Sequence, residues 1–217
     1  MAALDLYGLE RSVYTRIARL ALEEKGVPYV LHEVEIFGPG GVPPEQLARH
    51  PFGRIPALAH DGFVLYETGA ITRYVDEGFA GPPLQPHEPA RRARMNQLIG
   101  VFDAYGYRPM VWGVYVERVG QPQRGRTPDE AVIAAALRDA QRCLEAALAL
   151  RSGTPWLLGS EPTLADLHAY PMLRVLSLAP EGAALLQRHP SLQRWLELMQ
   201  QRPSVQRTRS SREPAAS

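Results

Sequence analysis

Hydrophobic and polar positions divide the chain into a first part that carries both strand and helix patterns and a second part that carries helix patterns alone. In the first part, short β-rich runs predict four strands, and apolar residues at helical spacing predict two helices. The strands are expected at residues 3–7, 29–36, 56–60 and 63–66, and the helices at 12–25 and 68–78. The opening strand–helix–strand unit favours a parallel pair with a right-handed crossover. Asp61-Gly62 is a strong hairpin signal between the last two strands.

The second part follows a segment rich in proline and glycine. Gly81-Pro82-Pro83 and Pro86 interrupt the helical pattern, so a linker is expected at residues 80–87. Beyond it, the helices are expected at residues 90–119, 129–150, 163–178 and 190–201. Pro109 is the place where the first of them would bend, because proline removes a ladder hydrogen bond.

These patterns predict the fold class α/β plus all-α. The α/β domain is expected at residues 1–79, and a helical bundle domain at residues 88–205. Residues 206–217 are rich in Arg, Ser, Pro and Ala and are expected to form a disordered tail.

Composition narrows the classes of function. The 217 residues carry a formal net charge of +1, which gives no global field for nucleic acid or anionic membrane. No apolar run is long enough to cross a bilayer, so a cytoplasmic protein is expected. The single cysteine, Cys143, excludes an internal disulfide and a cysteine-based zinc site. The histidines are scattered over different elements, and no metal site is expected.

Ser12 stands where the first strand has ended and the first helix begins. A serine at this position can cap the helix by accepting a hydrogen bond from a free amide. The same position suits a nearby anion such as a thiolate, because the free amides and the positive helix end stabilise negative charge. A hydroxyl that donates to sulfur would lower the pKa of the thiol. Tyr7 and Tyr14 are alternative sources of that hydroxyl.

Two further turns carry candidate binding groups. Pro56 opens a strand directly after Arg54 and Ile55; in the cis form it would present the amide and carbonyl of Ile55 to a peptide lying along the sheet edge. Glu67-Thr68 falls between a strand and a helix, where free amides and the Thr68 hydroxyl suit a carboxylate and Glu67 suits an ammonium group. Read alone, Pro56 is better explained as the start of an edge strand, and Glu67-Thr68 as a helix cap.

Taken in order, these segments resemble the amino-terminal domain of the glutathione transferases, and the resemblance extends over nearly the whole chain. The spacing is most similar to the serine-type classes, phi and theta, and to their bacterial relatives. The segments that carry it are Leu6-Tyr7-Gly8 with Ser12, Leu22 to Gly26, His50 before Pro51-Phe52-Gly53, Ile55 to Leu58, Leu65 to Thr68 with Ala70-Ile71, and the capping box Thr163 to Asp166.

The resemblance implies a thioredoxin-like domain with a cis Pro56, a helical domain that shapes a second-substrate pocket, and a homodimer. Carried over to this sequence, Ser12 is the thiolate partner, with Tyr14 and Tyr7 as competitors. Ile55 would bond the cysteinyl part of glutathione. The γ-glutamyl end would lie at Glu67 and Thr68, and Arg54 would reach that end or the glycine carboxylate.

A pocket for a hydrophobic electrophile is expected from both domains. Its candidate residues are Leu9, Arg11, Phe37, Tyr105, Met110 and Trp112. One departure from the phi pattern stands out. Phi-type relatives place a His-Lys pair where this chain has Gly40-Gly41-Val42-Pro43, so the usual grip on the glycyl carboxylate is missing.

The resulting hypothesis is a bacterial, cytoplasmic glutathione transferase of detoxification. It would conjugate the glutathione thiolate to a hydrophobic electrophile, with glutathione as co-substrate and no metal. The missing His-Lys pair motivates an alternative, a non-catalytic binding or regulatory module of the same fold. Another alternative keeps glutathione but changes the reaction to isomerisation, dehalogenation or ether cleavage.

Overall fold

The computed structural model describes residues 4–211 and residue 213. They form two compact units. One unit contains the described residues up to Leu84 together with those from Arg202 onward, and the other is Gln85–Gln201. No described helix is long and apolar enough to cross a membrane.

The first unit is built on a four-stranded sheet in the order β2-β1-β3-β4. Its strands are β1 (Leu4–Gly8), β2 (Tyr29–Glu33), β3 (Ala57–His60) and β4 (Phe63–Tyr66). β1 and β2 pair in parallel, whereas β3 is antiparallel to both β1 and β4. The predicted parallel pair is therefore confirmed, and so is the hairpin, in which Asp61 and Gly62 have positive φ angles of 49° and 81°.

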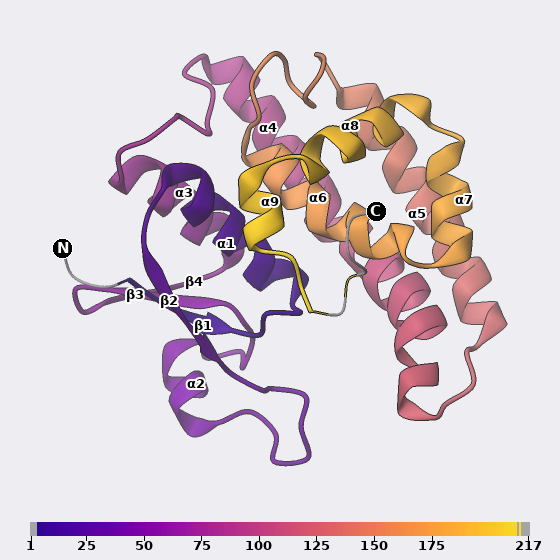
Figure 1. The fold of residues 1–217 in the computed structure, drawn as a ribbon, viewed down its shortest axis with the longest axis horizontal. Helices are drawn as coiled ribbons and strands as arrows, with labels where there is room; N and C mark the ends of the chain where they lie inside the picture. Colours follow the sequence, from indigo (N-terminus) through magenta and orange to yellow (C-terminus); the bar gives the residue numbers. More distant parts are fainter. Residues whose placement is uncertain (1–3, 212, 214–217) are drawn as a thin grey trace. The chain divides into compact units, whose positions relative to one another are not determined.

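Three helices frame this sheet: α1 (Val13–Lys25), α2 (Pro44–Arg49) and α3 (Thr68–Gly78). Figure 1 shows α1 and α3 on one side of the strands and α2 on the other. The apolar stripe of α1 faces the sheet, and Ile17, Leu20 and Leu58 have no exposed surface. Gly26 ends α1 with φ 65°, a left-handed conformation that glycine adopts without strain.

Residues 203–208 pack on α1, so the first residues of the disordered tail predicted at 206–217 are instead ordered and partly helical. Helix α9 (Pro203–Arg207) belongs to the first unit, and Thr208 after it is fully buried. The cause is a buried arginine on α1, Arg19, whose guanidinium donates to the carbonyls of Arg207 and Thr208 at 3.3 and 3.5 Å. A buried cation needs such acceptors. Residues 212 and 214–217 of the predicted tail lie outside the described residues.

The second unit is helical throughout its regular structure, as predicted. Its α-helices are α4 (Pro89–Val101), α5 (Glu130–Leu150), α6 (Leu164–Ser177), α7 (Pro180–Gln187) and α8 (Pro190–Gln200). A short 3₁₀ turn, η3 (Pro122–Arg124), precedes α5.

The helix expected at residues 90–119 does not keep one hydrogen-bond pattern. After α4 it continues as two wider π-helical segments, η1 (Phe102–Gly106) and η2 (Arg108–Gly120). The amide of Tyr107 bonds the Phe102 carbonyl, and the amide of Gln121 bonds the Val116 carbonyl, so the bonds span five residues. Extended π-helix is rare.

The predicted capping box at the start of α6 is confirmed. Asp166 has no exposed surface and accepts hydrogen bonds from the amides of Leu157 and Thr163 at 2.9 and 2.8 Å and from the indole of Trp195 at 2.8 Å. One carboxylate thus joins the loop before α6, the start of α6 and α8.

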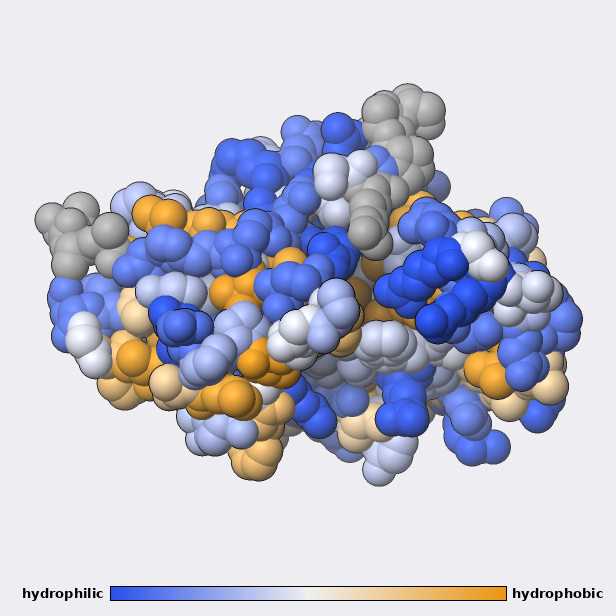
Figure 2. Space-filling model, turned by 90° about the horizontal axis from the view of Figure 1, so that it is seen from below, coloured by the Kyte–Doolittle hydropathy of each residue, from blue (hydrophilic) through white to orange (hydrophobic). Residues whose placement is uncertain are grey.

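Hydrophilic residues cover most of the face seen in Figure 2, and hydrophobic residues form small groups among them. Small apolar groups of this kind are normal on a folded protein.

Candidate functional site

Ser12 is the N-cap of α1. It has extended backbone angles, and its Oγ accepts a hydrogen bond from the Thr15 amide at 3.3 Å. The capping role expected for a serine is therefore present. Because Oγ acts as an acceptor in this bond, its hydrogen stays available to a second group outside the helix. The half-buried hydroxyl and the positive end of α1 together suit a thiolate.

Tyr7 is held in a different environment. Its ring stacks on His32 with centroids 4.8 Å apart, and the Arg49 guanidinium lies 3.8 Å from the ring centroid. Side chains alternate along a strand, so Tyr7 points to the face opposite the buried Leu6. These contacts favour a packing role for Tyr7. Tyr14 is half-buried in the first turn of α1.

The peptide bond between Ile55 and Pro56 is cis, which confirms the isomer that the resemblance implies. Ile55 is 8% exposed, and β3 begins at Ala57. The preceding residue, Arg54, is exposed at the surface. The main-chain groups of Ile55 therefore sit just before the strand, where an added peptide could pair with them.

Glu67 has φ 70° and ψ 114°, a conformation that a residue with a side chain rarely adopts. Strain of this kind costs about 1–3 kcal/mol and is typical of binding and catalytic sites. No side chain caps α3, whose first residue, Thr68, is 7% exposed. Within the described part of the chain, the exposed Glu67 carboxylate makes no hydrogen bond or ion pair. Its charge and the free amides beside it can both reach a ligand.

The strand register brings these three turns together. Tyr7 of β1 pairs with Ala57 of β3, and Ala57 pairs with Tyr66 of β4. Each turn lies next to this row: the one to Ser12 follows β1, Pro56 precedes β3, and Glu67 follows β4. The three candidate groups therefore lie at the same end of the sheet. Across the strands their order is Ser12 after β1, Ile55-Pro56 before β3 and Glu67 after β4.

His50, which follows α2, is buried with 2% of its surface exposed. Its ring is centred 4.7 Å from the ring of Tyr66, and its Nδ1 has no hydrogen-bond partner among the described residues. Burial lowers the pKa of the His50 imidazole, although the negative charge of Glu67 opposes this effect. The ring is therefore neutral at pH 7.

The residues expected to form the second-substrate pocket are divided between the two units. In the first unit Leu9 is buried, whereas Arg11 and Phe37 are exposed. In the second unit Tyr105 is 67% exposed and Trp112 is 39% exposed. Met110 differs from expectation, because it has no exposed surface and packs in the helical core close to Gly106.

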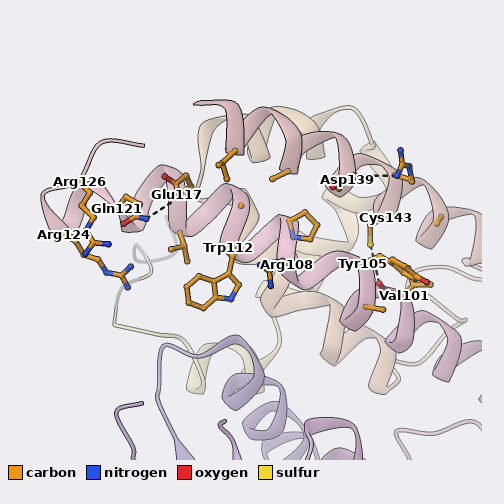
Figure 3. Close-up of a pocket in the computed structure, with 18 residues that line it drawn as sticks. Val101, Tyr105, Arg108, Trp112, Glu117, Gln121, Arg124, Arg126, Asp139 and Cys143 are labelled. Atoms are coloured by element: carbon orange, nitrogen blue, oxygen red, sulfur yellow. Dashed lines mark hydrogen bonds and ion pairs between the residues drawn. The ribbon is translucent and has the colours of Figure 1, made fainter. Parts of the chain in front are cut away.

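The helical unit contains a pocket of about 1000 Å³ between η2 and α5. Figure 3 shows Tyr105, Trp112 and Arg108 around it, with Cys143 on α5. Burial raises the pKa of the Cys143 thiol to about 11, so the group is protonated and unreactive at neutral pH. No group of His, Cys, Asp and Glu residues suitable for a metal ion occurs in the described part of the chain.

Comparison with known families decides the assignment. The glutathione S-transferase N-terminal domain model matches residues 6–83, and the glutathione S-transferase C-terminal domain model matches residues 130–198. The chain belongs to the glutathione S-transferase family. Its amino-terminal unit is accordingly thioredoxin-like, as the resemblance implies.

Individual relatives agree with this assignment to the glutathione S-transferases, which are transferase enzymes. Glutathione S-transferase F13 of Arabidopsis thaliana is 30% identical over 204 residues, which is 93% of each chain. The crystal structure of Populus trichocarpa glutathione transferase F7 is 31% identical, covers 95% of this chain and 97% of its own, and superposes with a TM-score of 0.82. Glutathione S-transferase I from maize, solved with an atrazine glutathione conjugate, is 28% identical with a TM-score of 0.82 and covers 95% and 96%. These relatives are plant proteins and give no support to the predicted bacterial origin.

Proposed function

We propose that glutathione lies along the edge of the sheet at the ends of β1, β3 and β4. Its thiolate would lie at Ser12, its cysteinyl backbone at Ile55, and its γ-glutamyl end at Glu67 and Thr68. The observation that supports this proposal most strongly is the register that aligns Tyr7, Ala57 and Tyr66. Two strand spacings amount to about 10 Å, which is also about the reach of three extended residues.

Each group then has a chemical role. The positive end of α1 and the Ser12 hydroxyl stabilise the thiolate after its proton has left for solvent. A lone pair of the sulfur forms a bond to an electrophilic carbon. In a substitution the leaving group departs with its bonding pair, and in an addition the neighbouring atom takes up a proton. Arg54 offers a cation to one of the two glutathione carboxylates, and no step requires a metal.

The second substrate would be a hydrophobic electrophile. Exposed apolar and aromatic surface at Phe37, Tyr105 and Trp112 supports this class of substrate. Of the other residues expected around this substrate, Leu9 and Met110 are each buried within their own unit, whereas Arg11 is exposed. The serine-type class, the cytoplasmic location, the homodimer and a detoxifying role follow from the family resemblance and are part of the same proposal.

The missing His-Lys pair supports a second candidate function, a glutathione-binding module without catalysis. Residues 38–44 consist of glycine, proline and valine and offer no cation to the glycyl carboxylate. This module would bind glutathione weakly and show no conjugation with a broad panel of electrophiles.

Ser12→Ala tests the catalytic assignment with 1-chloro-2,4-dinitrobenzene as the electrophile. We expect kcat/KM to fall by about 10²-fold, the usual effect of removing one hydrogen-bond donor to a developing charge. The pKa read from its pH profile should rise, because the thiolate loses that donor. Ser12→Thr keeps the hydroxyl and is the matched control. Unchanged turnover in Ser12→Ala with a loss in Tyr14→Phe or Tyr7→Phe would move the role to that tyrosine.

A further inference from the structure

Gln46 is the only buried residue of α2 and has no exposed surface. A short helix that covers a sheet is ordinarily anchored by an apolar side chain. On α2 the apolar Leu47 is instead 46% exposed. The anchor position therefore carries an amide, which is costly to bury unless it is hydrogen-bonded.

That amide bonds the segment leading to Pro56. Gln46 Nε2 donates to the Arg54 carbonyl at 2.7 Å, and the main-chain carbonyl of Gln46 accepts from the His50 amide at 2.8 Å. Within the segment, the Gly53 amide bonds the His50 carbonyl at 2.8 Å. One residue of α2 thus fixes both ends of residues 50–54.

The bond to Arg54 also orients its neighbour. The Arg54 carbonyl and the Ile55 amide belong to the same planar peptide unit, and this unit is trans, since the two cis bonds of the described chain precede Pro56 and Pro155. In a trans peptide the C=O and N–H groups point in opposite directions. When Gln46 draws the carbonyl toward α2, the Ile55 amide is aimed away from α2.

Burying the Gln46 side chain has an energetic cost, which arises at its amide oxygen. Gln46 Oε1 is buried and has no hydrogen-bond partner among the described residues. A buried unsatisfied acceptor costs about 1–3 kcal/mol. An apolar residue of the same length would avoid that cost but would leave the Arg54 carbonyl without a donor.

We infer that Gln46 is a positioning residue for glutathione: through the Arg54–Ile55 peptide it sets the direction of the Ile55 amide that bonds the cysteinyl part of the ligand. The inference rests on the proposed function. In this proposal Gln46, a residue of α2 that does not contact the ligand, determines how accurately the Ile55 amide is oriented toward it.

The test measures affinity for S-methylglutathione, which has no thiol to ionise, by calorimetry on the full chain. Gln46→Met has similar length and no donor, and it should weaken binding about tenfold, or about 1.4 kcal/mol. The KM for glutathione should rise by the same factor, with kcat for 1-chloro-2,4-dinitrobenzene changed less than twofold. The matched control is Leu47→Met on the exposed face of α2, which should bind like wild type.

Gln46→Glu gives a readout that a purely structural role would not move. The ionised carboxylate repels the Arg54 carbonyl, whereas the protonated acid donates to it as the amide does. Affinity relative to wild type should therefore recover as pH falls, and this measurement decides the question if Gln46→Met does not fold. Wild-type affinity in Gln46→Met, or a pH-independent deficit in Gln46→Glu, would overturn the inference. Failure of the wild type to bind S-methylglutathione would instead refute the proposed function.

Discussion

The strained backbone at Glu67 makes a quantitative prediction about stability. Glu67→Ala and Glu67→Gly both remove the carboxylate, so the difference between their unfolding free energies isolates the backbone conformation. At φ 70° and ψ 114° alanine keeps a steric cost of about 1–3 kcal/mol, which glycine does not bear. The glycine variant loses about 0.5–1 kcal/mol of folding stability, because its unfolded chain has more conformational freedom. Glu67→Gly should therefore be the more stable variant by about 1 kcal/mol.

Urea unfolding and thermal melts without glutathione measure this difference, and about 1 kcal/mol corresponds to about 2–4 °C in a chain of this size. Glu145 on α5 provides the control, because it is exposed and helical. There the order should reverse, with Glu145→Gly less stable than Glu145→Ala by about 1 kcal/mol. Equal stability of the two Glu67 variants, or a less stable glycine variant, would refute the strain argument.

Two predictions concern the helical unit. Asp166→Ala should lower the unfolding free energy by about 3–5 kcal/mol. The cause is that the amides of Leu157 and Thr163 and the indole of Trp195 lose their buried acceptor. A loss below about 1 kcal/mol, measured by urea unfolding, would contradict this account. Cys143, with a pKa of about 11, should resist a disulfide reagent at pH 8 and react fully once the chain is unfolded in urea. Rapid reaction of the folded protein would show that the thiol is not buried as described.

The elements that could be predicted from the sequence are those whose ends carry residues typical of turns or helix caps. Asp61-Gly62 has the turn residues of a tight hairpin, Gly26 ends α1, and Thr163 with Asp166 forms a capping box. The order of Ser12, Pro56 and Glu67 also follows from the sequence. Their position at the same end of the sheet could not be predicted, because it depends on how distant strands pair.

Other features depend on contacts between distant residues. α9 is held by the buried Arg19 of α1, a side chain that sequence patterns assign to the surface. Helix α2 is not among the helices that the sequence predicts, and only the structure shows that its Gln46 is buried and bonds the Arg54 carbonyl. Met110 falls at helical spacing with aromatic residues, and only the packing separates its core position from the exposed Trp112.

The most direct test of the central claim is a calorimetric titration of the wild type and of Glu67→Ala with glutathione. The account predicts saturable binding by the wild type and a dissociation constant at least tenfold higher in Glu67→Ala, a loss of about 1.4 kcal/mol. No binding by the wild type at millimolar glutathione, or equal affinity in the two proteins, would contradict it.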